Sequence, residues 1–256
     1  MTESVRFASV RGPELVGELE VPADGARGWG VFVHGFTLGK ESPAAVRISR
    51  SLADGGIGML RYDALGLGES AGEWGDGSFT VKVADTVRAG ESLAARGTPP
   101  ELLIGHSWGG AAAIVAAQQL PSIRAVVTIG APSEPSEVER HYDAIVDEVM
   151  DEGSSPWRIG GKALTMKRDF VEDVRRADLI GRVRELDRPL LIMHSPTDAT
   201  VDIDNASEIF RAALHPRSFV SLEGSDHFLT VAGQAERAAL IISAWADQYL
   251  RTDPAD

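Results

Sequence analysis

The stretch from residue 101 to residue 118 constrains the fold most, because it places a glycine-bounded turn between an apolar run and a helix-forming run. Leu-Leu-Ile at 102–104 enters a Gly-His-Ser-Trp-Gly pentad at 105–109, and small apolar residues follow. In a G-x-S-x-G pentad between a strand and a helix, the serine occupies a strained turn that exposes its hydroxyl. The flanking glycines give that turn room. The stretch therefore predicts that Ser107 is a nucleophile.

A serine hydroxyl becomes a useful nucleophile only when a neighbouring base, oriented by a third group, takes its proton. Among the six histidines, only His227 lies in a loop after the last predicted strand, 218–222. Catalytic groups of open α/β sheets gather at the carboxyl ends of the strands, where this loop lies. We therefore expect His227 to be the base.

The orienting acid is expected just past a strand end, between the serine and the histidine in chain order. Asp198 meets this condition, because it follows the predicted strand 189–194. Glu134 follows the preceding strand and is the structural rival. An aspartate in such a turn can also simply cap local N–H groups. Chain order favours Asp198.

Attack on a carbonyl also needs hydrogen-bond donors for the oxyanion that forms. One expected donor is the backbone N–H of Trp108, the residue after the nucleophile. The other is the N–H of Phe36, in the loop that follows the continuous apolar run 29–33. The sequence thus predicts an oxyanion hole made by Phe36 and Trp108.

Strands and helices alternate along most of the chain, which predicts an α/β fold with a mostly parallel, doubly wound sheet. Residues 4–10 and 14–21 alternate apolar and polar side chains and predict an antiparallel hairpin at its edge. Residues 133–188 interrupt the alternation, and a structureless loop of that length is uncommon. We expect a small, mainly helical cap there, with helices near 137–152 and 169–185, the second broken at Gly181. Residues 1–132 and 189–256 form the core.

Composition narrows the function classes. A net charge of −13 argues against nucleic acid or an anionic membrane as partner, and zero cysteines exclude thiolate catalysis and disulfides. No apolar run is long enough for a membrane span, and the first residues do not read as a signal peptide, so we expect a cytoplasmic protein. No metal-ligand or dinucleotide pattern is persuasive, so we expect no metal and no cofactor. A homo-oligomer stays open.

With these residues assembled, the chain resembles α/β-hydrolase-fold serine hydrolases of the carboxylesterase type. The resemblance rests on motifs in the family's order: His34-Gly-Phe36, Asp63-Ala-Leu-Gly-Leu-Gly-Glu-Ser70, Gly105-His-Ser-Trp-Gly109, Ser195-Pro-Thr-Asp198 and Asp226-His227. Within the family it is similar to cinnamoyl and feruloyl-type esterases. It also resembles the hydrolase half of bacterial proteins fused to an osmotically inducible redox domain. That domain's residues are not in this sequence, so we expect none of its activity here.

The resemblance implies hydrolysis of small to medium carboxylic esters through an acyl-enzyme on Ser107, with a small-molecule ester as partner. The same three residues would also serve a thioesterase, amidase, C–C hydrolase or perhydrolase, and a non-catalytic ligand-binding protein is a further alternative. Loops and insertions at the strand ends choose the substrate on such a scaffold. Candidate substrate-binding residues are Trp157, Met166 and Phe228.

Overall fold

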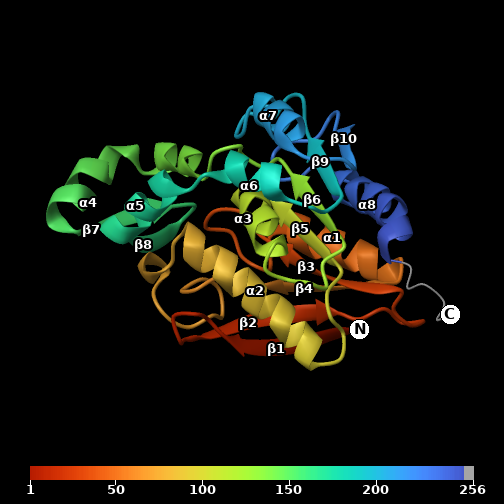
Figure 1. The fold of residues 1–256 in the computed structure, drawn as a ribbon. Coiled ribbons are helices and arrows are strands. Elements are labelled where there is room, and N and C mark those ends of the chain that lie inside the picture. Colours follow the sequence, from red (N-terminus) through yellow and green to blue (C-terminus); the bar gives the residue numbers. More distant parts are fainter. Residues whose placement is uncertain (251–256) are drawn as a thin grey trace.

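The computed structural model describes residues 1–250; the polar tail 251–256, which the sequence predicts to fray, lies outside them. An eight-stranded sheet in the order β1-β2-β4-β3-β5-β6-β9-β10 runs through the described part of the chain (Figure 1). From β4 to β10 neighbouring strands are parallel, whereas β1 and β2 pair antiparallel at one edge. The strands are β1 (Thr2–Ala8), β2 (Glu14–Glu20), β3 (Gly28–Val33), β4 (Ile57–Tyr62), β5 (Leu102–His106), β6 (Ala125–Ile129), β9 (Leu190–His194) and β10 (Arg217–Ser221). The predicted parallel sheet with an antiparallel start is confirmed.

Helices cover both faces of this sheet, as its apolar strands require. The core helices are α1 (Pro43–Asp54), α2 (Phe79–Ala95), α3 (Trp108–Ala117), α7 (Asp204–Ala212) and α8 (Gln234–Leu250), with the 3₁₀ turn η1 (Trp74–Asp76). Helices α1 and α8 bury one hydrophobic cluster against the sheet, and α2 and α3 bury another on the opposite face. Successive residues of β5 show why: Leu102 and Ile104 belong to the first cluster and Leu103 to the second. A strand buried on both faces has to be apolar throughout.

The segment 133–188, which we call the cap, lies between β6 and β9 and projects at the left of Figure 1. Its elements are η2 (Pro135–His141), η3 (Asp143–Ile145), α4 (Val146–Glu152), β7 (Ser154–Ile159), β8 (Lys162–Lys167), α5 (Arg168–Arg176) and α6 (Leu179–Glu185). Strands β7 and β8 form an antiparallel hairpin that the sequence reading did not include. Gly160 and Gly161 both have positive φ at its tip, as a two-residue turn of this kind requires.

One helix boundary in the cap differs from the predicted one. The break in the second cap helix falls at Ala177 and Asp178, not at Gly181, because the Asp178 side chain accepts a hydrogen bond from the Gly181 N–H and begins α6. Asp204 is the first residue of α7. The Asp202 carboxylate accepts from its N–H at 2.9 Å.

Among residues 1–250, no helix combines the length and the apolar character needed to cross a membrane.

Candidate active site

Ser107 lies at the turn between β5 and α3, with φ 54° and ψ −130°. A non-glycine residue in the left-handed region stores strain of about 1–3 kcal/mol. The turn is possible because its flanking residues have no side chain. A Cβ at Gly105 would lie 2.3 Å from the Gly109 carbonyl oxygen, and one at Gly109 would lie 2.1 Å from that of Val33. The pentad therefore holds the Ser107 hydroxyl at the carboxyl end of the central strands.

His227 reaches Ser107 from the loop after β10. Its Nε2 is 3.0 Å from Ser107 Oγ, and its Nδ1 is 2.7 Å from Asp198 Oδ2. The carboxylate only accepts, so Nδ1 carries the proton and donates, which leaves Nε2 of the neutral ring as the acceptor facing the hydroxyl. Ser107, Asp198 and His227, which lie in three loops far apart in the sequence, thus meet in the structure.

Backbone hydrogen bonds hold the Asp198 side chain in addition to its contact with His227. Its Oδ1 accepts from the backbone N–H groups of Thr200 and Val201 at 2.8 and 2.9 Å. Burial alone raises the pKa of the carboxyl, but the hydrogen bonds from His227 and from these N–H groups outweigh it, so the pKa falls below its ordinary value. The carboxylate is therefore ionised at neutral pH. The rival acid, Glu134, has an exposed side chain at the start of η2.

The two predicted oxyanion donors lie on loops that touch each other. A Cβ at Gly35 would be 3.1 Å from Ser107 Cβ, so the backbone before Phe36 passes close to the serine. Within residues 1–250, neither the Phe36 N–H nor the Trp108 N–H donates to another group. Two free backbone donors beside a serine hydroxyl suit a negatively charged oxygen.

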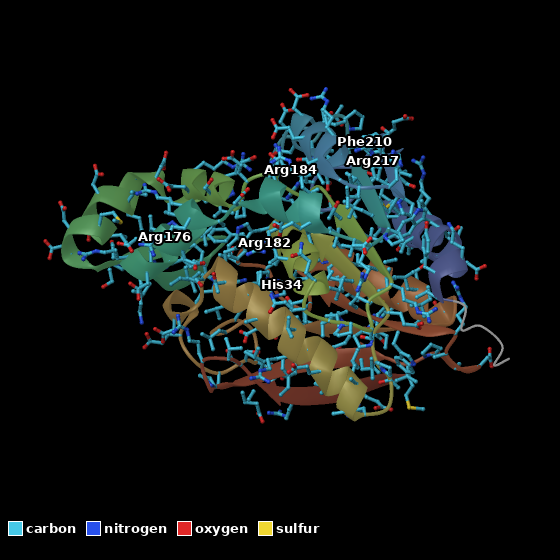
Figure 2. All side chains as sticks on the ribbon, viewed as in Figure 1. His34, Arg176, Arg182, Arg184, Phe210 and Arg217 are labelled. Carbon is cyan, nitrogen blue, oxygen red and sulfur yellow. The ribbon has the colours of Figure 1, made fainter. Side chains whose placement is uncertain are left out.

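His34, labelled in Figure 2, anchors the loop 34–41, which we call the oxyanion loop. His34 Nδ1 donates to the Gly35 carbonyl at 2.9 Å, and its Nε2 accepts from the Ala64 N–H at 3.2 Å. Burial, followed by the positive charge of Lys82, keeps the pKa of His34 well below its ordinary value. The ring is therefore neutral and ties the loop to the turn after β4.

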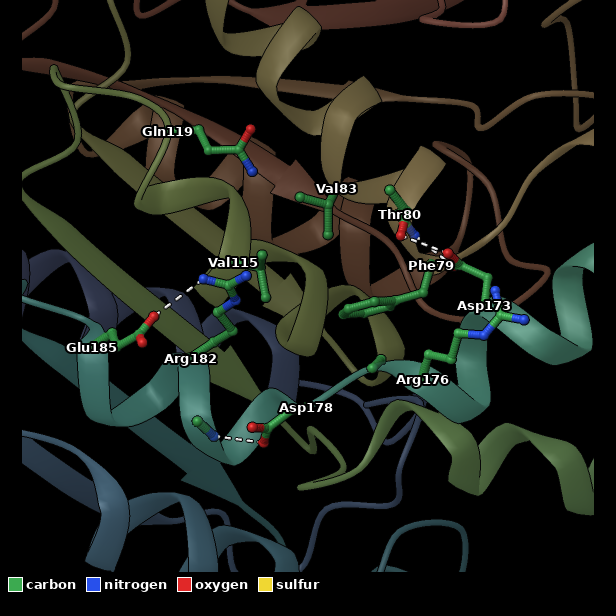
Figure 3. A pocket seen from close by; sticks show the side chains of 12 residues that line it. Phe79, Thr80, Val83, Val115, Gln119, Asp173, Arg176, Asp178, Arg182 and Glu185 are labelled. Atoms are coloured by element: carbon green, nitrogen blue, oxygen red, sulfur yellow. Dashed lines mark hydrogen bonds and ion pairs between the residues drawn. The ribbon is translucent and has the colours of Figure 1, made fainter.

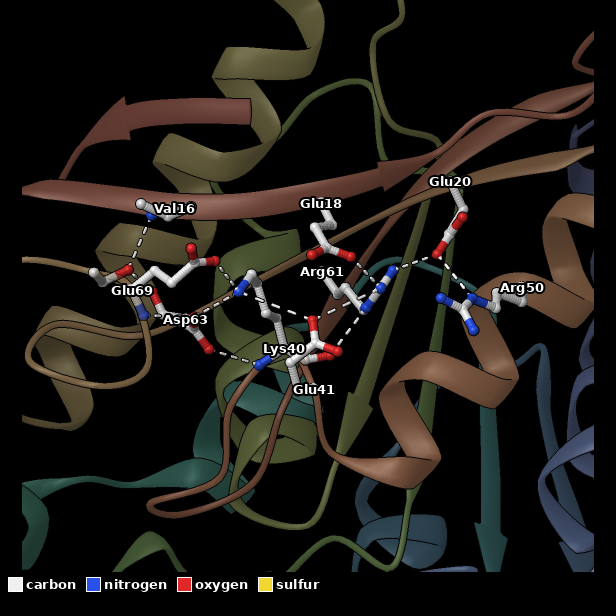
Figure 4. A network of polar contacts seen from close by, with 10 residues as sticks. Val16, Glu18, Glu20, Lys40, Glu41, Arg50, Arg61, Asp63 and Glu69 are labelled. Carbon is white, nitrogen blue, oxygen red and sulfur yellow. Dashed lines mark hydrogen bonds and ion pairs between the residues drawn. The ribbon is translucent and has the colours of Figure 1, made fainter. Parts of the chain in front are cut away.

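Figure 4 shows a second anchor of the oxyanion loop, a network of buried charges around Asp63 and Arg61. Asp63 Oδ1 accepts from the Lys40 backbone N–H at 2.8 Å, while the Lys40 Nζ lies 3.2 Å from Asp63 Oδ2 and 2.5 Å from Glu69 Oε2. Arg61, fully buried, donates from Nε to the Lys40 carbonyl at 2.9 Å. Both ends of the Lys40 residue are thus fixed from β4 and the turn that follows it.

Phe36 is the centre of an aromatic cluster between core and cap. Its ring meets those of Trp74 and Trp108 edge-on, at 5.6 and 5.5 Å, and stacks on His141 at 5.8 Å. His141 was missed from sequence, since nothing in the pattern of the cap places it over the oxyanion loop. Burial, then the charges of Arg140 and His227, lowers the pKa of His141.

The three predicted substrate-binding residues lie in different surroundings. Trp157, on β7, is 5.8 Å from the Phe36 ring and donates from Nε1 to the His141 carbonyl at 3.1 Å. Met166, on β8, is fully buried. Phe228 is 44% exposed and meets the His227 ring edge-on at 5.0 Å. Trp157 and Phe228 therefore adjoin the site, whereas Met166 packs inside the cap.

A larger cleft lies away from these three residues. A cavity of about 530 Å³ separates α2 and α3 from the cap helices α5 and α6 (Figure 3). Phe79 lines it, and the Phe79 ring meets the Trp108 ring edge-on at 5.5 Å. None of Ser107, Asp198 and His227 lines this cleft. Its size therefore does not make it the place of the chemistry.

Comparison with known proteins identifies the family of this chain. The model of the alpha/beta hydrolase family matches residues 31–240. The chain belongs to the alpha/beta hydrolase family. It is 38% identical to a solved esterase domain of a Rhodothermus marinus protein, with a TM-score of 0.78 over 98% of this chain and 99% of that one. No curated protein matches this alpha/beta hydrolase.

Two more distant structures share the alpha/beta hydrolase fold. Est1E from Butyrivibrio proteoclasticus, solved with ferulic acid bound, is 18% identical with a TM-score of 0.77, over 97% of this chain and all of that one. A dienelactone hydrolase from Anabaena variabilis is also 18% identical, with a TM-score of 0.70 over 98% and 99%. At this identity the likeness concerns the fold alone.

Proposed function

We propose that this hydrolase cleaves small to medium carboxylic esters through an acyl-enzyme on Ser107. The observation that carries the proposal is the continuous contact from Ser107 Oγ through His227 to the ionised Asp198, beside two free N–H donors. Membership in the family and the 38% identity to an esterase domain support it.

Each residue has a distinct role in the proposed mechanism. Ser107 Oγ attacks the ester carbonyl while His227 Nε2 takes its proton, and the N–H groups of Phe36 and Trp108 stabilise the oxyanion. The imidazolium, stabilised by Asp198, then gives the proton to the leaving alcohol. A water molecule then attacks the acyl carbon while His227 takes its proton. The bond to Ser107 Oγ breaks, the imidazolium gives its proton to Oγ, and the carboxylic acid leaves.

A labelled fluorophosphonate tests the nucleophile, because it reacts covalently with activated serines. We expect mass spectrometry to find the adduct on Ser107 of the wild type and no adduct in Ser107→Ala. The variant should also lose hydrolysis of p-nitrophenyl acetate by several orders of magnitude. Full hydrolysis by pure Ser107→Ala protein would contradict the proposal.

A substrate panel tests which type of bond the protein cleaves. Esters that vary in acyl length and aromaticity are compared with matched thioesters, amides and peracid formation. We expect the esters to have the highest kcat/KM. If the esters are the poorest substrates, the same residues serve one of the other acyl-transfer reactions, and the ester assignment is wrong.

A further inference from the structure

Lys82, on α2, is a buried amine whose Nζ lies 5.9 Å from the centroid of the Trp108 ring and has, within the described residues, no carboxylate in contact. The residue is 5% exposed, and among residues 1–250 no acceptor lies within hydrogen-bond distance of Nζ and no carboxylate oxygen lies within 4 Å. The carboxylate of Asp85, one turn further along the helix, instead accepts from Ser9 Oγ at 2.9 Å and from the Val10 N–H at 2.8 Å. An unpaired buried charge is costly, so the amine favours any anion that reaches it.

The amine faces a small cavity that adjoins the proposed oxyanion hole. The cavity has a volume of about 30 Å³, and its walls include Gly35 and Thr37 of the oxyanion loop and Trp108 of the turn after Ser107. Such a volume holds one or two water molecules. A single carboxylate group therefore fits it, whereas an aromatic ring does not.

A second unpaired lysine lies on the other side of the same loop. Lys162 reaches from β8 of the cap and donates to the Thr37 carbonyl, and no described carboxylate is within ion-pair distance of it. The charges of Lys82 and Lys162 both lower the pKa of His34. Two lysine side chains thus adjoin this loop, and Asp85, which also lines the cavity, is held by hydrogen bonds from Ser9 and Val10. The positive charge of a lysine attracts anionic ligands.

Burial lowers the pKa of Lys82 to about 7, and the nearby Asp85 only partly opposes this. Near neutral pH the amine therefore takes up a proton at little cost when an anion arrives. The resulting ammonium–carboxylate contact, away from water, is roughly twice as strong as a bond between neutral groups.

We propose that Lys82 binds the terminal carboxylate of a short acyl group, so that the protein prefers half-esters of short dicarboxylic acids. This inference rests on the ester hydrolysis proposed above. With the ester carbonyl oxygen against the N–H groups of Phe36 and Trp108, an acyl chain that continues behind the oxyanion loop enters the cavity at Lys82. The cavity's small volume limits the chain to a few carbons.

The kinetic test uses two esters of equal acyl length, monoethyl succinate and ethyl butyrate, and follows acid release at pH 7. We expect wild type to prefer the half-ester, and Lys82→Met to reduce the ratio of the two kcat/KM values by about tenfold or more. Lys162→Met is the matched control, because it removes a nearby positive charge that does not line the cavity. Its ratio should change by less than about threefold. An unchanged ratio in Lys82→Met, or equal losses in both variants, would overturn the proposal.

A binding measurement separates this inference from the proposed function. Calorimetry on Ser107→Ala should detect succinate binding, butyrate should bind much more weakly, and Ser107→Ala/Lys82→Met should lose the difference. Circular dichroism confirms that the variants are folded. If no ester is hydrolysed by wild type, the proposed function fails, and succinate binding alone decides the site. Absence of succinate binding, or equal binding without Lys82, would refute it.

Discussion

The imidazole of His106 donates a hydrogen bond from Nε2 to the backbone carbonyl of His227, and the two atoms are 2.7 Å apart. The two rings also pack against each other at 5.1 Å. Burial, followed by the charge of His227, lowers the pKa of His106 to about 4, so the ring is neutral at pH 7. The residue before the proposed nucleophile thus fixes the loop that carries the proposed base.

We expect His106→Phe to lower kcat roughly tenfold, because a small misplacement of a reacting group is costly. The phenyl ring keeps the packing but leaves the buried His227 carbonyl without its donor, which costs about 1–3 kcal/mol of stability. Steady-state kinetics on a small ester and urea unfolding measure both effects. A normal kcat in a destabilised variant would mean that the bond is structural only.

Asp198→Asn should lower kcat by about 10³–10⁴, because an amide favours the wrong histidine tautomer. In the wild type, the pKa of Asp198 is lower in the folded state than in the unfolded state. The ionised carboxylate therefore stabilises the fold at pH values above its unfolded pKa. That stability is lost as the pH falls through the folded value. Unfolding measured between pH 7 and strongly acidic pH should show a shallower decline for Asp198→Asn than for wild type. Parallel declines would contradict the linkage.

Asp63→Asn should destabilise the protein by about 3 kcal/mol, because it leaves the buried Lys40 ammonium with only two exposed carboxylate partners, Glu41 and Glu69. It should also lower kcat, since Lys40 belongs to the oxyanion loop. Glu69→Gln is the matched control: it removes a partner whose side chain is 65% exposed, and it should cost much less stability than Asp63→Asn. Urea unfolding compares the two. Equal losses of stability in the two variants would contradict the argument that burial makes the Lys40–Asp63 pair important.

Gly105→Ala should prevent the native turn around Ser107, since the new Cβ would lie 2.3 Å from the Gly109 carbonyl oxygen. Gly97→Ala offers the comparison, because Gly97 has φ +82° with nothing within 4 Å of the added Cβ. Backbone strain alone costs about 1–2 kcal/mol there. We expect soluble, active Gly97→Ala protein and inactive or unfolded Gly105→Ala protein, as judged by thermal melting and esterase assay. An active Gly105→Ala variant would refute the packing argument.

The parallel sheet was readable from sequence because its local and global signals agree. Apolar runs too short for helices, each ending in a glycine-rich or polar turn, mark the strands of the sheet. Chain order and strand ends then placed Ser107, Asp198 and His227, which meet at hydrogen-bond distances. The sequence did contain a signal for the hairpin of β7 and β8, because Gly160-Gly161 lies between two runs of alternating residues. We predicted a mainly helical cap and did not use that signal.

Other features had no local signal at all. Lys82 sits on an amphipathic helix where a lysine ordinarily extends to solvent, and only the packing of α2 beneath the oxyanion loop buries it. His141 similarly becomes part of the site because the cap folds back over Phe36. Such contacts join residues far apart in the chain and depend on the tertiary fold.

The cap shares its hydrophobic interior with the body of the protein. Val149, Trp157 and Phe170 belong to the same continuous cluster as Leu103 of the central strand and Trp108 after the serine. A detachable lid would have a hydrophobic cluster of its own, whereas within residues 1–250 these cap side chains belong to the cluster of the body. Unfolding of the insertion therefore exposes part of the interior of the body, and we expect cap and body to melt together as one cooperative unit.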